Sequence, residues 1–405
     1  MVYFSFLLFL FIASNEETSI VNPLSRLLAL PLPEKEERGL LYTPAEIAQQ
    51  PATWQTTHRL FEEARSELVS FLQQAHAERW TIYLVGAGTS DYIGHSIANL
   101  LRRRWGCEVS AIASTDLLTN RDDLVIPDRD YLWISFSRSG DSPEGVAVLE
   151  QALASSPKVR HLVVSCNKNG RMVELAQQSK SCFAMLLDDA VNDRSLAMTS
   201  SFTNMVVFGQ ELAHLWDKEC FEETLDRMTL AADYVLHEGA YLAHTLAQND
   251  YRRACFVGAG ALGATARESA LKILELTSGD IQTMHETTLG LRHGPMSSLN
   301  METLFTGFVS TDDRRRRYDV DLLNGIRAKQ VVRTIVAIGW SDATSDYSLH
   351  CDAFDDLGDA YRPAVDVIFS QMLGLFSSIE LGLKPDSPSP NGLISRVVEQ
   401  FAIYA

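Results

Sequence analysis

The sequence predicts an α/β protein built from two tandem domains, each a doubly wound parallel sheet in a three-layer α/β/α sandwich. Two observations lead to this prediction. Short apolar runs that end in glycine-rich loops recur in register in both halves of the chain, which indicates an internal duplication. Amphipathic segments of helical period separate these runs, and strands that alternate with such helices form parallel sheets covered on both faces.

Composition and charge limit the kind of partner. The chain has 405 residues, 46% of them hydrophobic and 9% aromatic, which suffices for two or three domains with their own cores. Its 52 acidic residues outnumber 35 basic ones, and the net charge of −17 repels nucleic acids and acidic membranes. The basic run at 314–317 lies among aspartates and is expected to be a solvated face. We therefore expect a small-molecule partner, with no nucleic acid and no membrane.

The N-terminal segment, 1–44, begins with the apolar stretch FSFLLFLFIAS. It lacks the basic region of a secretory signal and is too short to span a bilayer, which favours a docking segment or a misassigned start over a signal peptide. The 6 cysteines form no CxxC pair, and the 10 histidines form no HExxH motif. We expect reduced thiols in a cytoplasmic protein with no metal and no cofactor.

The repeated runs set the predicted domains. TIYLVGAGTS (81–90) matches ACFVGAGALG (254–263) at an offset of 172, which is 258 − 86. LWISFS (132–137) matches FTGFVS (305–310), and HLVVSC (161–166) matches TIVAIG (334–339), each at an offset of 173 (305 − 132 and 334 − 161). We expect the first domain at 45–213, a helical connector at 214–248 and the second domain at 249–383. The tail, 384–405, is rich in proline and should be an extended arm that ends in a short helix.

Two loops of the first domain are candidates for a phosphate site. GAGTS (86–90) and SRSGDS (137–142) each follow a predicted strand and precede a helix, and ligands of open α/β sheets bind beyond the carboxyl ends of the strands. Ser142 and Pro143 form a strong helix start, with serine as N-cap and proline in the first position. Hydroxyls, free backbone N–H groups and a helix dipole would then converge on one anion. The alternative is a capped turn with spare serines.

The corresponding loop of the second domain matches a dinucleotide fingerprint only in part. Residues 258–263 satisfy GxGxxG, and Asp280 follows about 20 residues later, as that fingerprint requires. The acid should end the next strand, but Asp280 comes before any strand. Nucleotide binding is therefore disfavoured.

The helix that follows this loop carries a candidate acid–base set. Glu268, Lys272 and Glu275 stand at i, i+4 and i+7, which places them on one helix face. The segment GLRHGP (290–295) then places Arg292 and His293 in a loop fixed by glycine and proline. A carboxylate, a lysine and a histidine near a phosphate site could move protons. Surface salt bridges and a structural histidine are the alternatives.

These motifs together resemble the double sugar-isomerase (SIS) domain proteins, and most of all the AgaS-type galactosamine-6-phosphate deaminases/isomerases, which are tagatose-6-phosphate ketose/aldose isomerase-like. The segments that carry the resemblance are the two VGAG runs, SRSGDSPE, ESALKILEL, GLRHGP and the closing RVV, over residues 45–400. The resemblance implies two sets of substrate-binding residues. The sugar-phosphate cradle would comprise Ser90, Ser137, Arg138, Ser139 and Ser142, and the sugar-contact loop Thr199 and Ser200.

The same resemblance, through the isomerase domain of glucosamine-6-phosphate synthase, implies catalytic roles. Glu275 would move a proton between carbons 1 and 2, with Glu268 and Lys272 beside it. His293 would assist ring opening from the neighbouring subunit, so we expect a homodimer or a higher homo-oligomer.

Two departures from that synthase bear on the reaction. Its N-terminal glutaminase uses a cysteine directly after the initiator methionine, whereas this chain has Val2, so we expect no glutamine-derived ammonia. Its C-terminal lysine holds the keto sugar as a Schiff base, whereas the corresponding stretch of this chain has Arg396. The resemblance therefore implies that Arg396 binds the substrate. An arginine is always protonated and cannot form that imine.

The sequence therefore predicts a deaminase/isomerase that converts galactosamine 6-phosphate to tagatose 6-phosphate and ammonia. A base removes the proton from carbon 2, reprotonation at carbon 1 leaves a ketimine, and water hydrolyses it. A plain ketose/aldose phosphate isomerase and a glucosamine-6-phosphate deaminase are alternatives, because the sequence does not reveal which epimer the loops accept. A non-catalytic sugar-phosphate-binding regulator is a second alternative, and it would have no need of Glu275.

Overall fold

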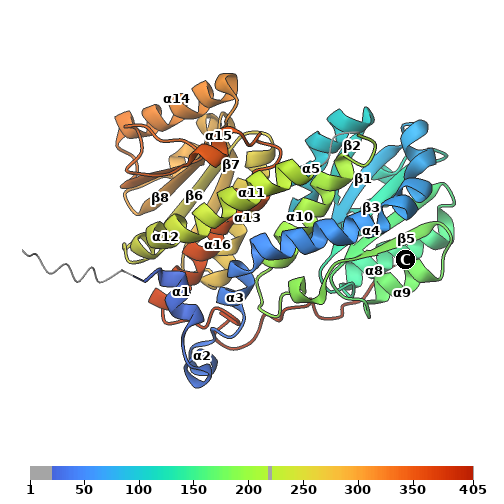
Figure 1. Ribbon diagram of the computed structural model, residues 1–405, viewed down its shortest axis with the longest axis horizontal. Coiled ribbons are helices and arrows are strands. Elements are labelled where there is room, and N and C mark those ends of the chain that lie inside the picture. Colours follow the sequence, from blue (N-terminus) through green and yellow to red (C-terminus); the bar gives the residue numbers. More distant parts are fainter. Residues whose placement is uncertain (1–20, 218–220, 405) are drawn as a thin grey trace, which may run out of the picture.

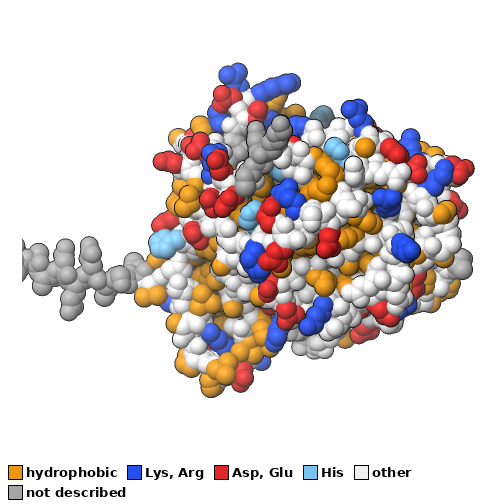
Figure 2. All heavy atoms as spheres, turned by 45° about the vertical axis from the view of Figure 1, so that its right-hand side comes forward, with side chains coloured by type: hydrophobic (Ala, Val, Ile, Leu, Met, Phe, Trp, Pro, Cys, Tyr) orange, Lys and Arg blue, Asp and Glu red, His pale blue; other side chains and the backbone are white. Residues whose placement is uncertain are grey.

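The computed structural model describes residues 21–217 and 221–404, so the predictions for the apolar N-terminal stretch and for Cys220 lie outside the described residues. Two five-stranded parallel sheets stand at opposite ends of the molecule, with a layer of helices between them (Figure 1). The predicted fold class is confirmed. Charged side chains of both signs are interspersed over the face shown in Figure 2 and do not form a patch of one sign.

The strands of the two sheets follow the predicted repeat. The first sheet contains β1 (Thr81–Gly86), β2 (Val109–Ala113), β3 (Tyr131–Ser137), β4 (Val159–Ser165) and β5 (Cys182–Leu186). The second contains β6 (Arg253–Gly258), β7 (Gln282–Thr287), β8 (Thr303–Phe308), β9 (Thr334–Ile338) and β10 (Tyr347–Leu349).

Both sheets have the same topology. The first runs β2-β1-β3-β4-β5 and the second, read in the same direction, β7-β6-β8-β9-β10. The chain order reverses between β1 and β3 and again between β6 and β8, which is where ligands bind in such sheets.

The strand ladders refine the predicted repeat. Ile82 pairs with Leu132 and Ala254 with Leu304, so the offset is 172 for the first two strands (254 − 82 and 304 − 132). Leu132 also pairs with Arg160, and Leu304 with Thr334, an offset of 174 (334 − 160). The predicted offset of 173 was one residue too long for the second strand and one too short for the third.

Helices cover both faces of each sheet and link the two halves. Those of the first half are α5 (Thr89–Trp105), α6 (Ser114–Thr119), α7 (Arg121–Leu124), α8 (Pro143–Ser155), α9 (Arg171–Gln177), η1 (Asp189–Val191) and α10 (Ser200–Ala213). Those of the second are α13 (Ala261–Leu276), η3 (Gly290–His293), η4 (Pro295–Ser298), α14 (Asp313–Lys329), α15 (Asp352–Asp355) and α16 (Pro363–Glu380). The N-terminal helices are α1 (Pro23–Leu28), α2 (Leu32–Arg38), α3 (Thr43–Ala48) and α4 (Gln50–Ala77), and the segment between the halves holds α11 (Glu222–Tyr234), η2 (Val235–Gly239) and α12 (Ala240–Ala247).

The centre of the molecule is made of helices that are buried on every side. Every side chain of α10 is buried, as is every one of α16 as far as Ser378. Several polar side chains in this layer bond to one another, as when Gln50 Nε2 donates to Gln371 Oε1 at 2.8 Å. Such pairing stabilises the layer because an unpaired buried polar group costs about 1–3 kcal/mol. None of the helices formed by residues 21–217 and 221–404 is long and apolar enough to cross a membrane.

The C-terminal arm (384–405) runs back from the second half to the first. Asp386 fastens its start, because this carboxylate accepts hydrogen bonds from the backbone N–H groups of Leu41 (2.7 Å) and Thr43 (2.8 Å). The short terminal helix that we predicted is wrong for residues 384–404, which are irregular. The carbonyl of Arg396, which a helix would use internally, instead accepts a hydrogen bond from Arg138 at 2.7 Å.

Candidate active site

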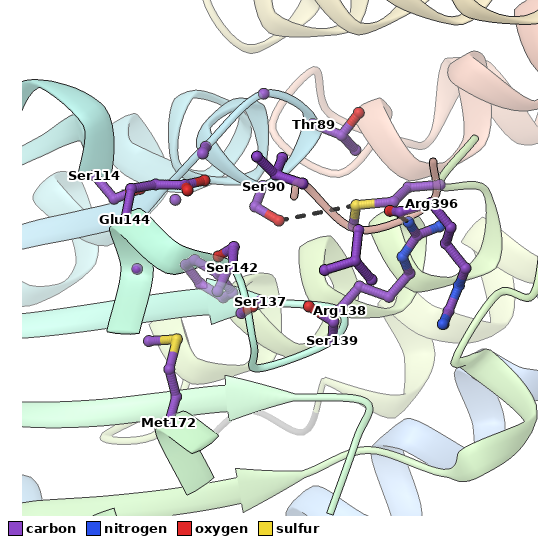
Figure 3. A pocket seen from close by; sticks show the side chains of 18 of the residues that line it. Thr89, Ser90, Ser114, Ser137, Arg138, Ser139, Ser142, Glu144, Met172 and Arg396 are labelled. Atoms are coloured by element: carbon purple, nitrogen blue, oxygen red, sulfur yellow. Dashed lines mark hydrogen bonds between the residues drawn. The ribbon is translucent and has the colours of Figure 1, made fainter. Parts of the chain in front are cut away.

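A cavity of about 290 Å³ opens at the carboxyl edge of the first sheet, between β1 and β3 (Figure 3). Its lining comes mainly from the loop after β1, the loop after β3, the end of α13 and the C-terminal arm, and a few residues after β2, in α9 and before α10 complete it. We call residues 86–90 the glycine loop and residues 137–142 the hydroxyl loop. Both candidate phosphate loops therefore border one cavity.

The glycine loop brings the start of α5 against the cavity. A side chain at Gly86 would come within 2.3 Å of the Ser90 carbonyl carbon, and Gly88 has φ 55° and ψ −126°, a conformation that other residues avoid. The helix begins at Thr89, so its free N–H groups lie at this edge. The hydroxyls of Thr89 and Ser90 follow at once and are largely buried.

The hydroxyl loop turns the chain from β3 into α8. Ser137 Oγ accepts a hydrogen bond from the Gly140 N–H at 3.0 Å, and Ser139 Oγ accepts one from the Asp141 N–H at 3.2 Å. Ser142 has the backbone geometry of an N-cap, and Pro143 is the first helical residue, as predicted. The Ser142 hydroxyl, however, makes no capping hydrogen bond. It lines the cavity instead, where it is available to a ligand.

Arg138 ties the walls of the cavity together. Its guanidinium donates to the carbonyls of Ser195 (3.1 Å), Leu196 (3.2 Å) and Arg396 (2.7 Å). Burial lowers the pKa of Arg138, and the charge of Asp193 partly offsets that effect. These bonds direct the guanidinium at protein carbonyls, so Arg138 holds the arm and the 195–196 segment beside the hydroxyl loop.

The candidate catalytic side chains lie along one face of α13, as predicted. Lys272 forms an ion pair with Glu275, and its Nζ lies 3.3 Å from Glu268 Oε1 and 3.1 Å from Thr89 Oγ1. Glu268 and Lys272 are fully buried, whereas the Glu275 side chain is 28% exposed and lines the cavity. Of the three, Glu275 is thus the one that a ligand would meet.

The electrostatics of this face set the charge on each group. The pKa of Glu268 is raised to about 8, because burial, together with the neighbouring Glu275, outweighs the opposing effect of Lys272. Burial alone would lower the pKa of Lys272, but the two carboxylates outweigh it and raise that pKa. A charged Lys272 therefore stands between the two carboxyl groups, and its ion pair with Glu275 holds that side chain in place.

Thr199 and Ser200, at the start of α10, are not among the residues that line the cavity. Both hydroxyls and both N–H groups bond to the buried carboxylate of Asp193. Arg396 does line the cavity, but its guanidinium donates to the Asp193 carbonyl at 2.6 Å and to Asn192. All these groups stabilise the segment that precedes α10.

His293 is exposed at the end of η3, next to Gly294, which has φ 122°. It is not among the residues that line the cavity. The structure of one chain thus brings together the two loops, α13 and the arm, but leaves His293 outside.

The cavity residues that the sequence analysis missed include Ser114 and Glu144. Ser114 follows β2 at the same sheet edge, and Glu144 stands in the first turn of α8 (left side of Figure 3). Glu144 is 4% exposed, and its Oε2 has no hydrogen-bond partner among the described residues. The sequence signal for Ser114 was its place directly after a strand at this edge, a criterion that we applied only to the other two loops.

Similarity to known proteins agrees with this architecture, although no protein-family model matches the chain. The D-galactosamine-6-phosphate deaminase AgaS of Escherichia coli is 35% identical over 380 residues, which cover 90% of this chain and 95% of that protein. The protein of the same name from Shewanella sp. (strain ANA-3) is 30% identical, over 93% of this chain and 95% of its own.

Solved structures show the same relation. Tagatose-6-phosphate ketose/aldose isomerase from Escherichia coli superposes with a TM-score of 0.80 at 33% identity, over 90% of this chain and 96% of that one. The C-terminal domain of glucosamine-fructose-6-phosphate aminotransferase from Francisella tularensis shares the fold, with a TM-score of 0.70 at 17% identity over 83% and 95% of the chains. Given this identity over nearly the whole length of both chains, the protein belongs to the AgaS family of double sugar-isomerase (SIS) domain proteins.

Proposed function

We propose that this chain is an amino-sugar phosphate deaminase that converts galactosamine 6-phosphate to tagatose 6-phosphate and ammonia. The observation that carries the proposal is the meeting, in one cavity, of a hydroxyl-rich helix start and the carboxylate of Glu275. The helix start binds the phosphate of the sugar phosphate, and the Glu275 carboxylate reaches the opposite end of the sugar. The names of the relatives, galactosamine-6-phosphate deaminase and tagatose-6-phosphate isomerase, support this substrate class.

The phosphate would lie in the hydroxyl loop. Ser142 offers a hydroxyl that no cap consumes, Ser137 and Ser139 shape the turn, and Ser90 faces them from α5. The N-terminus of α8 adds its dipole and free N–H groups. Arg138 and Arg396 act mainly through the walls that they hold, and Thr199 and Ser200 act through Asp193.

The proton transfer would be carried out by Glu275. As a carboxylate held by Lys272 it takes the proton from carbon 2 of the opened amino aldose, which leaves an enolamine. It returns that proton to carbon 1, and the nitrogen then forms a ketimine at carbon 2. Water adds to the ketimine carbon, the carbon–nitrogen bond breaks, and ketose and ammonia leave.

The remaining parts of the proposal concern the assembly. We take 45–213 and 249–383 as the two SIS domains, joined by 214–248, and a cytoplasmic homodimer as the working unit. His293, which is exposed on its own chain, would then enter the cavity of the partner chain and assist ring opening.

The experiment is a substrate panel. Purified protein is given galactosamine 6-phosphate, glucosamine 6-phosphate and tagatose 6-phosphate, and ammonia release and ketose formation are measured together with exchange of the carbon 2 hydrogen in deuterated water. Ammonia from the first substrate above the second supports the proposal, and the reverse order makes the chain a glucosamine-6-phosphate deaminase. Exchange or isomerisation without ammonia makes it a plain isomerase, and binding without exchange makes it a sensor.

A further inference from the structure

The second half contains a counterpart of the candidate active site. A cavity of about 510 Å³ lies at the switch point of the second sheet, between β6 and β8. Its lining comes from the start of α13, the loop after β8, the last turns of α5 and residues 358–361. Since α5 packs against α13, the start of each helix lies at one cavity and its end at the other.

The two helices can be compared position by position. Gly88 (φ 55°, ψ −126°) and Gly260 (φ 60°, ψ −124°) have the same conformation directly before α5 and α13, at an offset of 172 (260 − 88). The position of Glu275 in α13 then corresponds to Arg103 in α5 (275 − 172), and Arg103 lines the second cavity. A guanidinium that stays protonated replaces the carboxylate, so the second cavity has no proton acceptor at this place.

The loop after β8 already holds an anion, and that anion belongs to the protein. The Asp359 carboxylate accepts hydrogen bonds from Ser310 Oγ (2.6 Å), the Thr311 N–H (3.0 Å) and Arg315 Nη1 (2.8 Å). These donors lie just beyond the strand and in the first turn of the next helix, and Thr311 Oγ1 adds a longer bond at 3.3 Å. The hydroxyl loop also has a hydroxyl just beyond its strand, that of Ser139, and another directly before its helix, that of Ser142, whereas the first turn of α8 has no donor side chain. Arg315 belongs to the basic run 314–317, which is largely exposed as predicted, and its side chain is 55% exposed while it pairs with Asp359.

Asp359 comes from the segment that precedes α16, whereas in the first half the segment before α10 contributes Leu196 and Met198 to the cavity wall. Burial of Asp359 would raise its pKa, but the bonds from Ser310, Arg315 and the Thr311 N–H outweigh burial and lower it. The carboxylate is therefore ionised at neutral pH, 6% exposed, and held by donors from the loop after β8 and from the start of α14.

We propose that the Asp359 carboxylate is a built-in substitute for phosphate in the second half's copy of the anion site, and that its removal leaves a site which binds inorganic phosphate. This inference rests on the proposed function in one respect: it takes the hydroxyl loop as the phosphate site with which the second cavity is compared. The duplication thus leaves one sugar-phosphate site per chain, with its counterpart filled from within.

The test is rescue by phosphate. Asp359→Ala, and the milder Asp359→Ser, are compared with wild type by thermal unfolding, in chloride and in millimolar inorganic phosphate at equal ionic strength. Both variants should unfold at lower temperature in chloride, and phosphate should raise their midpoints by at least about 3 °C more than it raises that of wild type. The matched control is Asp366→Ala, which also removes a buried carboxylate from an arginine, Arg362, although Asp366 does not line the cavity.

The outcomes separate the two proposals. Phosphate stabilisation equal in wild type, the Asp359 variants and the control would overturn the substitute-anion inference, and so would Asp359 variants that stay unfolded even when refolded in phosphate. Neither result bears on turnover of sugar phosphates, which depends on the first cavity. A catalytically inert wild type whose Asp359 variants are rescued would instead refute the proposed function alone.

Discussion

Replacing Glu275 by glutamine tests the proposed chemistry most directly. The substitution keeps the shape of a side chain that lines the cavity but removes the proton acceptor. Lys272 loses one of its two carboxylate partners, and the other, Glu268, can ionise in response because its pKa of about 8 is raised by burial and by Glu275 itself. The fold should therefore tolerate the change, and the loss should fall on catalysis.

The expected loss of turnover follows from the role of Glu275 as a general base. A positioned general base contributes about 10²–10⁴ in rate, and a hundredfold loss corresponds to about 2.7 kcal/mol of barrier. Phosphate affinity should stay within about twofold, a change worth less than roughly 0.5 kcal/mol, because the hydroxyl loop is untouched. Turnover is followed by ammonia release, and the proton transfer by exchange of the carbon 2 hydrogen in deuterated water.

The matched control for this variant is Glu174→Gln, which alters an exposed glutamate paired with an arginine on α9. It should keep wild-type turnover. If Glu275→Gln and Glu174→Gln both exchange the carbon 2 hydrogen at wild-type rate, Glu275 is not the base and the reasoning fails.

Three further predictions test the cradle, the partner chain and the pH response. Ser142→Ala should weaken inorganic phosphate and substrate together, by about 1–3 kcal/mol for a charge-assisted bond, and inhibition by phosphate at the wild-type constant would argue against the cradle. Inactive Glu275→Gln and His293→Ala chains, once mixed and exchanged, should recover roughly a quarter of wild-type activity if sites are shared in a dimer, whereas proven exchange with no recovery would place His293 outside the reaction. Burial raises the pKa of Glu211 to about 7, and its hydrogen bond raises the pKa of His58, so the folded pair binds protons that the unfolded chain releases. The free energy of unfolding should therefore fall as pH rises from 6 to 8, Glu211→Gln should flatten that slope in denaturant titrations, and an unchanged slope would contradict the assignment.

The repeat made much of the fold predictable. Apolar runs before glycine loops depend on local chemistry, so the strands, the loops and the shared face of Glu268, Lys272 and Glu275 could be read from the sequence. The predicted offsets of the second and third strands were each wrong by one residue, because the two halves were aligned by sequence alone. The hydrogen bonds between strands fix the register.

Contacts between distant segments were the part that the sequence could not give. A serine before proline predicts a cap, yet the Ser142 hydroxyl bonds to no helix N–H. The arm was expected to end in a helix, but the Arg396 carbonyl instead accepts a hydrogen bond from Arg138, which lies 258 positions away in the chain. Nothing local to residues 384–404 signals that partner, and the same holds for Asp359 beside Ser310.

The C-terminal arm has a consequence for biosynthesis. The first sheet, the glycine loop and the hydroxyl loop are complete once residue 213 has been made, and domains that emerge early fold while synthesis continues. Its cavity still lacks two walls at that moment, since Glu275 and the segment around Arg396 have yet to leave the ribosome. A nascent or truncated chain can therefore contain a folded first sheet and still lack a complete cavity. The cavity is complete only when the segment around Arg396 has crossed the molecule and accepts the hydrogen bond from Arg138.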